Sequence, residues 1–155
     1  MKTVQYYLMR HADYYDPINQ FVSYWGMLTL KSSMDKFKTE LAEKFPNKKL
    51  RIVHSMLPRA KHTALLMVDI LTGIKTFCRN DPRLNSDKLL ITQEYVKEVV
   101  SACEKEQEIC LILSHKPDIK CFCRKELELS QYLCMDITID EIYNKNEREE
   151  EELPF

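Results

Sequence analysis

The sequence ICLILSHKP, residues 109–117, contains the pattern that decides the fold class. Its first five residues are all apolar, which is typical of a strand buried on both faces of a parallel sheet. Ser114 and His115 follow this run, and Pro117 suits the first turn of a helix. We therefore predict a buried strand over residues 109–113 that leads through a histidine into a helix.

The same order of strand, polar residues and helix occurs twice more. Alternating apolar residues predict a strand over residues 3–9, and a second strand is predicted over residues 50–53. The helix after this second strand begins near Pro58 and continues to about residue 71. The polar residues that follow the three strands are Arg10 and His11, then His54, Ser55 and Arg59, and finally Ser114 and His115.

The spacing of apolar residues in the rest of the chain completes an α/β pattern. Residues 12–30 are predicted to be a loop, and apolar residues at helical spacing predict a helix over residues 34–45. A further helix is predicted over residues 89–103, with Ser86 as its N-cap, and a last strand over residues 132–139. Strands separated by helices predict a three-layer α/β/α sandwich with a mostly parallel central sheet.

The composition indicates one domain with almost no net charge. The 155 residues include 23 Lys and Arg and 24 Asp and Glu, so the formal net charge is −1. This balance argues against a nucleic-acid partner, because a polyanion requires a strongly basic surface. We predict a single domain over residues 1–143 and a flexible acidic tail over residues 144–155, where like charges repel one another.

The two glycines, Gly26 and Gly73, lie far apart in the chain. A Walker phosphate loop needs two glycines in one short segment, and a dinucleotide fingerprint needs three. Both motifs are therefore excluded. A phosphate bound by this chain must be held mainly by side chains and helix N-termini.

The cysteines and the N-terminal segment indicate a reduced, cytoplasmic protein. The six cysteines form no CxxC pair, so a zinc site with finger or ribbon spacing cannot be assembled. Arg10 and His11 interrupt the N-terminal apolar run, which therefore lacks the core of a signal peptide. No stretch approaches the roughly 20 apolar residues of a membrane span. We predict reduced thiols, no metal, no cofactor and no membrane partner.

The polar residues that follow the three strands predict an anion site. Parallel sheets bind ligands beyond the carboxyl ends of their strands, so these residues should lie at one edge of the sheet. Two arginines can bind phosphoryl oxygens in a bidentate manner, and helix N-termini favour the same charge. A neutral histidine can attack phosphorus, and a second histidine can donate a hydrogen bond to the developing charge.

Three segments resemble motifs of the histidine phosphatase superfamily, whose members are phosphoglycerate mutase-like. LMRHAD at residues 8–13 resembles the RHG signature, and HSMLPRAKHTALLM at residues 54–67 resembles the second block. LILSHKPDIKCF at residues 111–122 resembles the third block. The short chain and its HKPD sequence are most similar to the SixA-type phosphohistidine phosphatases.

The resemblance implies a role for each matching residue. His11 would be the nucleophile, and Arg10, Arg59 and His115 would complete the phosphate pocket. Ser55 occupies the position of a family serine or threonine and would help to bind the phosphate or orient the site. The implied reaction is a two-step hydrolysis without metal or cofactor, through a phosphohistidine on His11.

The chain departs from the family pattern mainly at the general acid. Larger members have a glutamate shortly after an Arg-Leu pair, whereas here Asn85, Ser86 and Asp87 follow. Asp87 and Asp13 are the candidate acids, with Asp118 a further one. General acid catalysis contributes about 10²–10⁴-fold when the leaving group is poor. The departure therefore favours substrates with good leaving groups and disfavours a sugar-phosphate mutase.

The sequence supports two hypotheses. The first is a phosphatase that acts on a phosphohistidine protein or on a small phosphorylated molecule. The alternative is a phosphate-binding adaptor of the same superfamily with weak or no turnover. A group of aromatic residues near the N-terminus is predicted either to pack in the core and loop or to form the wall of a substrate cleft. The members of this group are Tyr6, Tyr7, Tyr14, Tyr15, Tyr24 and Trp25.

Overall fold

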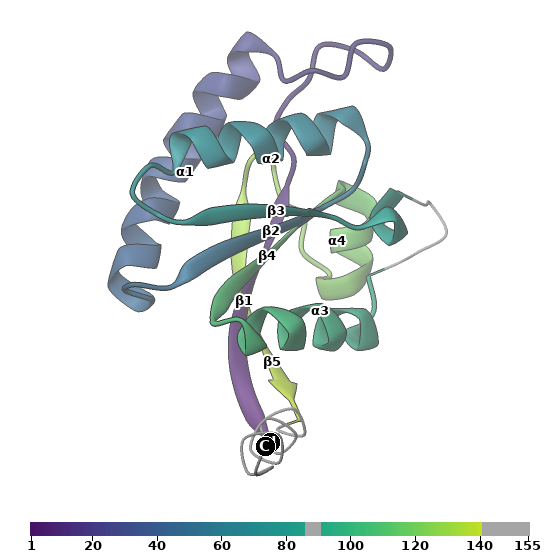
Figure 1. Cartoon of the computed structure of the whole chain (residues 1–155). Coiled ribbons are helices and arrows are strands. Elements are labelled where there is room, and N and C mark those ends of the chain that lie inside the picture. The colour runs from purple at the N-terminus through teal and green to yellow at the C-terminus, as the bar shows by residue number, and fades with distance from the viewer. Residues whose placement is uncertain (86–90, 141–155) are drawn as a thin grey trace, which may run out of the picture.

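The computed structural model describes residues 1–85 and 91–140, except for the side chains of residues 116–118 and 121, and shows one five-stranded sheet (Figure 1). Along the sheet the strands lie in the order β3-β2-β4-β1-β5. The first four strands run parallel, and β5 pairs antiparallel to β1. The strands are β1 (Lys2–Arg10), β2 (Lys49–His54), β3 (Thr76–Asn80), β4 (Glu108–Ser114) and β5 (Tyr132–Ile139).

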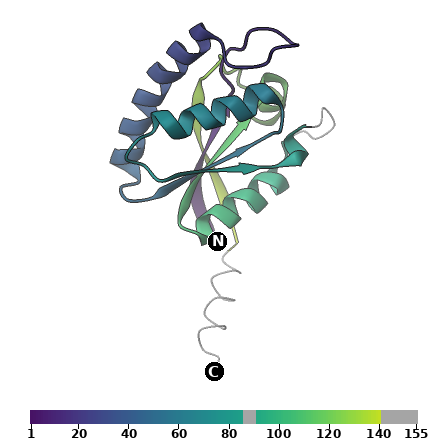
Figure 2. The same cartoon turned by 45° about the horizontal axis from the view of Figure 1, so that its top comes forward.

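Helices cover both faces of this sheet (Figure 2). They are α1 (Tyr24–Lys44), α2 (Pro58–Ile70), α3 (Gln93–Lys105) and α4 (Lys116–Cys123). α1 and α2 pack on one face, and α3 and α4 pack on the other. The predicted three-layer α/β/α sandwich is therefore confirmed. Among the described helices, none is both long and apolar enough to cross a bilayer.

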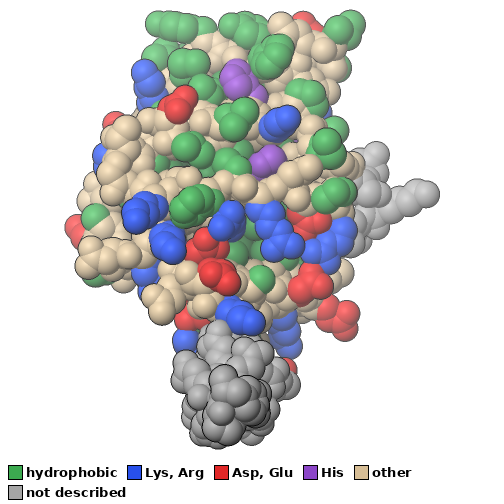
Figure 3. All heavy atoms as spheres, in the orientation of Figure 1, with side chains coloured by type: hydrophobic (Ala, Val, Ile, Leu, Met, Phe, Trp, Pro, Cys, Tyr) green, Lys and Arg blue, Asp and Glu red, His purple; other side chains and the backbone are tan. Residues whose placement is uncertain are grey.

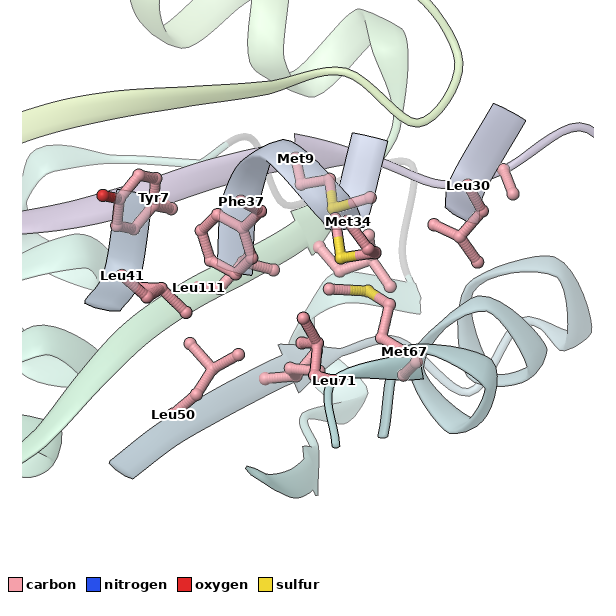
Figure 4. Packing of buried hydrophobic residues seen from close by; sticks show 14 of the residues in the cluster. Tyr7, Met9, Leu30, Met34, Phe37, Leu41, Leu50, Met67, Leu71 and Leu111 are labelled. Carbon is pink, nitrogen blue, oxygen red and sulfur yellow. The ribbon is translucent and has the colours of Figure 1, made fainter. Parts of the chain in front are cut away.

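Two apolar clusters explain the layers. Successive strand residues point to opposite faces, so Tyr7 and Met9 of β1 pack under α1 and α2, while Tyr6 and Leu8 pack against α3. In the first cluster, the ring of Phe37 from α1 meets Tyr7 edge-on, with ring centroids 4.9 Å apart (Figure 4). Every residue of β4 is buried, as predicted from its continuous apolar run.

The predicted loop over residues 12–30 is wrong beyond residue 23, because α1 begins at Tyr24. The hydroxyl of Ser23 accepts a hydrogen bond from the Gly26 N–H at 2.9 Å and caps the helix. The first turns of α1 leave Tyr24 and Trp25 exposed. These exposed aromatic residues obscure the helical spacing of apolar residues in the sequence.

Two further features between residues 76 and 92 differ from the prediction. β3 was not predicted, because this edge strand is mostly exposed and lacks a clear apolar alternation. Helix α3 begins at Gln93, and its N-cap is Thr92, whose hydroxyl accepts from the Tyr95 N–H at 3.1 Å. The predicted cap Ser86 lies outside the described residues, as do the domain end at residue 143 and the acidic tail.

Candidate active site

The carboxyl ends of β1, β4 and β2 lie side by side at one edge of the sheet. Arg10 of β1 is level with Ser114 of β4, and Leu113 is level with His54 of β2. The residues that follow these strands are therefore brought together, as the strand order predicts for a parallel sheet.

His11 leaves the end of β1 and is almost fully buried. Its backbone N–H donates to the Ser114 carbonyl at 3.4 Å, and its carbonyl accepts from the Ser130 N–H at 3.1 Å. The Nδ1 atom lies 2.9 Å from the Ala12 carbonyl oxygen. A carbonyl can only accept, so Nδ1 carries the proton in this contact and Nε2 keeps its lone pair.

His115 lies beside His11, with ring centroids 5.3 Å apart. It occupies the N-cap position of α4 but makes no side-chain capping hydrogen bond. Both of its ring nitrogens are buried and have no hydrogen-bond partner among the described residues. Two unpaired nitrogens at a helix N-terminus indicate a place for a polar ligand.

Two arginines complete the cluster. The Nη1 of Arg10 donates to the Leu127 carbonyl at 3.2 Å, which anchors its guanidinium at the end of β1. Arg59 lies in the first turn of α2, with its guanidinium 5.2 Å from the ring centre of Tyr14. Within the described part of the chain, the Nε of each arginine is buried and unpaired. Unpaired buried donors on two permanent cations favour an anionic ligand.

Burial and positive charge keep both histidines neutral. Burial is the main cause that lowers the pKa of His11 to about 4, and the charges of Arg59 and Arg10 lower it further. Burial also lowers the pKa of His115 to about 4, assisted by His11 and both arginines. At neutral pH the site therefore has two cations and a neutral imidazole with a free lone pair.

Acid is expected to destabilise the protein through these histidines. The pKa of His11 is about 4 in the folded state and 6.5 without the fold, so the unfolded chain binds more protons between these values. The contribution of neutral His11 to the free energy of unfolding is complete above about pH 6.5 and is lost as the pH falls toward 4. From pH 7 to pH 5 the loss is about 2 kcal/mol for His11. Urea unfolding at both pH values should show a smaller loss for His11→Gln than for wild type, and equal losses would contradict this assignment.

Ser55 and Asp13, which were predicted to act at the site, both have partners in the fold. Ser55 is fully buried, and its hydroxyl accepts from the Leu57 N–H at 3.3 Å, which stabilises the turn between β2 and α2. The Asp13 carboxylate accepts from the Ser23 hydroxyl at 2.8 Å. Contact of either residue with a phosphate stays a prediction. Asp87 lies outside the described residues, and the side chain of Asp118 is also not described.

Tyr14, predicted either to pack or to form the wall of a cleft, lies at the site, and Thr63 was not identified as a site residue from the sequence. The Tyr14 ring lies 5.6 Å from the His11 ring and also faces Arg59, so this member of the aromatic group lines the site. Buried Thr63 accepts from the Ala12 N–H at 3.1 Å and donates to the Arg59 carbonyl at 2.7 Å. It therefore connects α2 to the residue after His11. Its position one helical turn after Arg59 is the signal that could have identified it.

Gly26 lets α1 approach the backbone beside His11. A Cβ at this position would lie closer to the Asp13 carbonyl oxygen than real Cβ contacts allow. Gly26→Ala is therefore expected to destabilise the protein by about 1–3 kcal/mol and to displace Asp13 and, through Ala12, His11. Urea unfolding measures the loss of stability, and the rate of p-nitrophenyl phosphate hydrolysis reports the displacement of His11.

Gly73→Ala provides the matched control for Gly26→Ala. Gly73 has a φ of +86° but no atom within 4 Å of an added Cβ. Alanine there should lower stability by about 1 kcal/mol through backbone strain and leave the site unchanged. A Gly26→Ala protein with wild-type stability and activity would contradict the close-approach argument.

No group of three or more His, Cys, Asp and Glu side chains could hold a metal ion among the residues that the structure describes. The groups gathered at the sheet edge are instead cationic and imidazole donors, which suit an oxyanion.

Sequence comparison finds no matching protein-family model and no matching curated protein. Structure comparison finds the protein histidine phosphatase SixA complexed with tungstate, at 17% identity and a TM-score of 0.62, covering 90% of each chain. A second match is a putative SixA from Agrobacterium tumefaciens, at 14% identity and a TM-score of 0.60, covering 85% of this chain and 89% of that one. A putative alpha-ribazole-5′-P phosphatase from Escherichia coli matches at 13% identity and a TM-score of 0.57, covering 86% of this chain and 91% of that one. The chain thus has the phosphoglycerate mutase-like α/β fold that the motifs predicted.

Proposed function

We propose that this protein is a metal-independent phosphatase in which His11 is the nucleophile. The observation that carries the proposal is the pairing of a neutral histidine with buried, unpaired donors. His11 keeps a free Nε2 lone pair, and Arg10, Arg59 and His115 have buried nitrogens without partners among the described residues. The similarity in fold to a histidine phosphatase solved with tungstate supports the proposal, because tungstate is an oxyanion like phosphate.

The reaction has two balanced steps. In the first, the Nε2 lone pair of His11 attacks phosphorus, and the bond from phosphorus to the leaving group breaks with its electron pair. The leaving group takes a proton from the acid, for which Asp13 and Asp87 are the candidates, and phosphohistidine remains. In the second, water attacks phosphorus and returns one proton to that acid, the electron pair of the Nε2–phosphorus bond returns to Nε2, and inorganic phosphate leaves. His11 then returns to its starting neutral form.

The surrounding groups stabilise the transferred phosphoryl. Arg10 and Arg59 bind its non-bridging oxygens, and their charges offset the charge that develops on those oxygens. His115 donates a hydrogen bond from the N-terminus of α4. Asp13 is the candidate proton donor whose contacts the structure describes, and Asp87 remains the second candidate. Ser55 orients the turn that carries Arg59.

The substrate is a phosphohistidine protein or a small phosphorylated molecule with a good leaving group. The Asp13 carboxylate is held by the Ser23 hydroxyl, and Arg83-Leu84 is followed directly by Asn85, Ser86 and Asp87 in place of a glutamate. Weak assistance by an acid matters least when the leaving group departs easily, as imidazole does from phosphohistidine.

Trapping the covalent intermediate tests the proposal. The protein is mixed with p-nitrophenyl phosphate, quenched in alkali and analysed by peptide mass spectrometry. We expect one phosphoryl group on His11 that survives alkali and is lost in acid, and the same turnover with and without EDTA. Turnover that EDTA abolishes, or a phosphoryl group on a different residue, would refute the mechanism.

The alternative is a phosphate-binding adaptor, which the engagement of Asp13 by Ser23 favours. In that case the pocket binds tungstate but hydrolyses neither p-nitrophenyl phosphate nor phosphohistidine. Calorimetric titration with tungstate alongside both activity assays separates the two functions. Binding without turnover of either compound supports the adaptor.

A further inference from the structure

Large apolar side chains are exposed around the start of α1, next to the candidate active site. Ile18 is 98% exposed and Trp25 is 66% exposed. Figure 3 shows hydrophobic side chains gathered along the top of the view, where Figure 1 places the segment between β1 and α1 and the first turns of α1. We call this exposed set the apolar rim. Its members are Tyr15, Ile18, Phe21, Tyr24, Trp25 and Leu28.

The segment that carries half of this rim is a preorganised hairpin. Tyr14 and Val22 form an antiparallel bridge, and the Tyr15 N–H donates to the Phe21 carbonyl at 3.2 Å. The Asp16 carboxylate accepts from the Ile18 N–H at 2.8 Å, which closes the turn. The hairpin thus uses polar groups to hold its own backbone and leaves large apolar side chains in water.

The hairpin is fixed beside the site at both of its ends. At one end, the Tyr14 ring faces His11 and Arg59. At the other, the Val22 N–H donates to Nδ1 of His62 on α2 at 2.8 Å. The hairpin that carries half of the apolar rim therefore adjoins the anion site through Tyr14, and a protein ligand could contact both.

The charges of the rim segment favour a phosphorylated polypeptide over a membrane surface. Residues 14–30 contain no lysine or arginine, and exposed Lys31 follows them on α1. The other cations beside the rim, Arg10 and Arg59, have their Nε atoms buried in the anion site, where they suit one phosphoryl group. Cationic side chains next to apolar ones are what attract a peripheral protein to anionic lipids. Exposed apolar patches with aromatic residues are typical of protein interfaces.

We propose that the apolar rim docks a protein substrate, whose own apolar side chains flank the phosphorylated residue. This inference rests on the proposed function and selects, from its two substrate classes, the phosphorylated protein. The phosphoryl group enters the pocket of Arg10, Arg59 and His115. The flanking side chains cover Ile18 and Trp25, and this burial of apolar area supplies the specificity.

The test compares two synthetic phosphohistidine peptides of equal length and charge. One has leucines on both sides of the phosphohistidine, and the other has serines. We expect wild type to have a kcat/KM about 10-fold or more higher for the leucine peptide, since even one methylene in an apolar pocket changes kcat/KM by about 10–200-fold. Ile18→Ser should remove most of this preference and leave p-nitrophenyl phosphate hydrolysis unchanged. Ile18 is so exposed that its replacement should not affect folding.

Phe77→Ser is the matched control, because Phe77 is also an exposed apolar residue but lies on the edge strand β3. It should keep the wild-type preference. Trp25 is the only tryptophan, so its fluorescence reports binding directly. With His11→Asn, which cannot turn over, the leucine peptide should shift the Trp25 emission more than the serine peptide does.

Each outcome separates this inference from the proposed function. Hydrolysis of p-nitrophenyl phosphate with equal kcat/KM for both peptides overturns docking by the rim and leaves the phosphatase intact. Loss of the preference in Phe77→Ser as well as Ile18→Ser also overturns it. Without turnover of any compound the phosphatase proposal fails, and the Trp25 shift alone then decides docking. Binding to phosphatidylcholine vesicles that Ile18→Ser abolishes, with no preference between peptides, would assign the rim to a membrane.

Discussion

Replacing His11 by alanine is expected to lower kcat/KM for p-nitrophenyl phosphate by about 10³-fold or more. The substitution removes the Nε2 lone pair, so the covalent step has no nucleophile. It leaves Arg10, Arg59 and His115, and tungstate should therefore still bind. Steady-state kinetics together with calorimetric titration of tungstate measure the two effects separately.

His54 provides the matched control for this experiment. Like His11, it lies at the carboxyl end of a strand, is 5% exposed, and has Nδ1 within hydrogen-bond distance of the carbonyl of the next residue, here Ser55 at 2.8 Å. His54→Ala thus removes a histidine with the same burial and the same local contact. We expect it to reduce stability by a similar amount and to retain the covalent intermediate. Comparable activity in His11→Ala and wild type, or equal loss in both variants, would remove His11 from the nucleophile role.

The strands that position these histidines could be predicted because buried strands have recognisable runs of apolar residues in the local sequence. β4 lies between helices on both faces, so its continuous apolar run identifies it, and β5 begins and ends at the predicted residues. A parallel arrangement then places the residues after β1, β2 and β4 at one edge. That these residues lie together could therefore be predicted from the direction of the strands, without knowledge of any side-chain contact.

The parts of the site that sequence could not predict depend on contacts between distant segments. The Ser130 N–H donates to the carbonyl of His11, and Thr63 contacts the N–H of Ala12, across more than 50 residues in each case. No local pattern encodes such pairs. The hairpin before α1 was predicted only as loop, because its exposed aromatic residues do not alternate with buried ones.

Arg59→Met is expected to weaken tungstate binding by about 10²-fold and to lower kcat/KM by about 10²–10³-fold. The change removes a cation whose Nε is buried and unpaired among the described residues and whose guanidinium lies over the Tyr14 ring, and it keeps a side chain of similar length. Arg59→Lys keeps the charge but loses bidentate geometry, so its tungstate affinity and kcat/KM should lie between those of wild type and Arg59→Met. Lys61→Met, which removes an exposed cation from the same helix, should change either quantity by no more than about 2-fold.

The pH dependence of Arg59→Met distinguishes binding from a merely structural role. The positive charge of Arg59 helps to lower the pKa of His11 to about 4 and that of His115 to a similar value. Removing the charge must raise both pKa values toward 6.5. Protonated His11 has no lone pair, so the acid limb of kcat/KM should move to higher pH in Arg59→Met and stay in place in Lys61→Met. An unchanged acid limb, with activity reduced at every pH, would mean that Arg59 stabilises the fold of the β2–α2 turn and does not act on the reacting histidine.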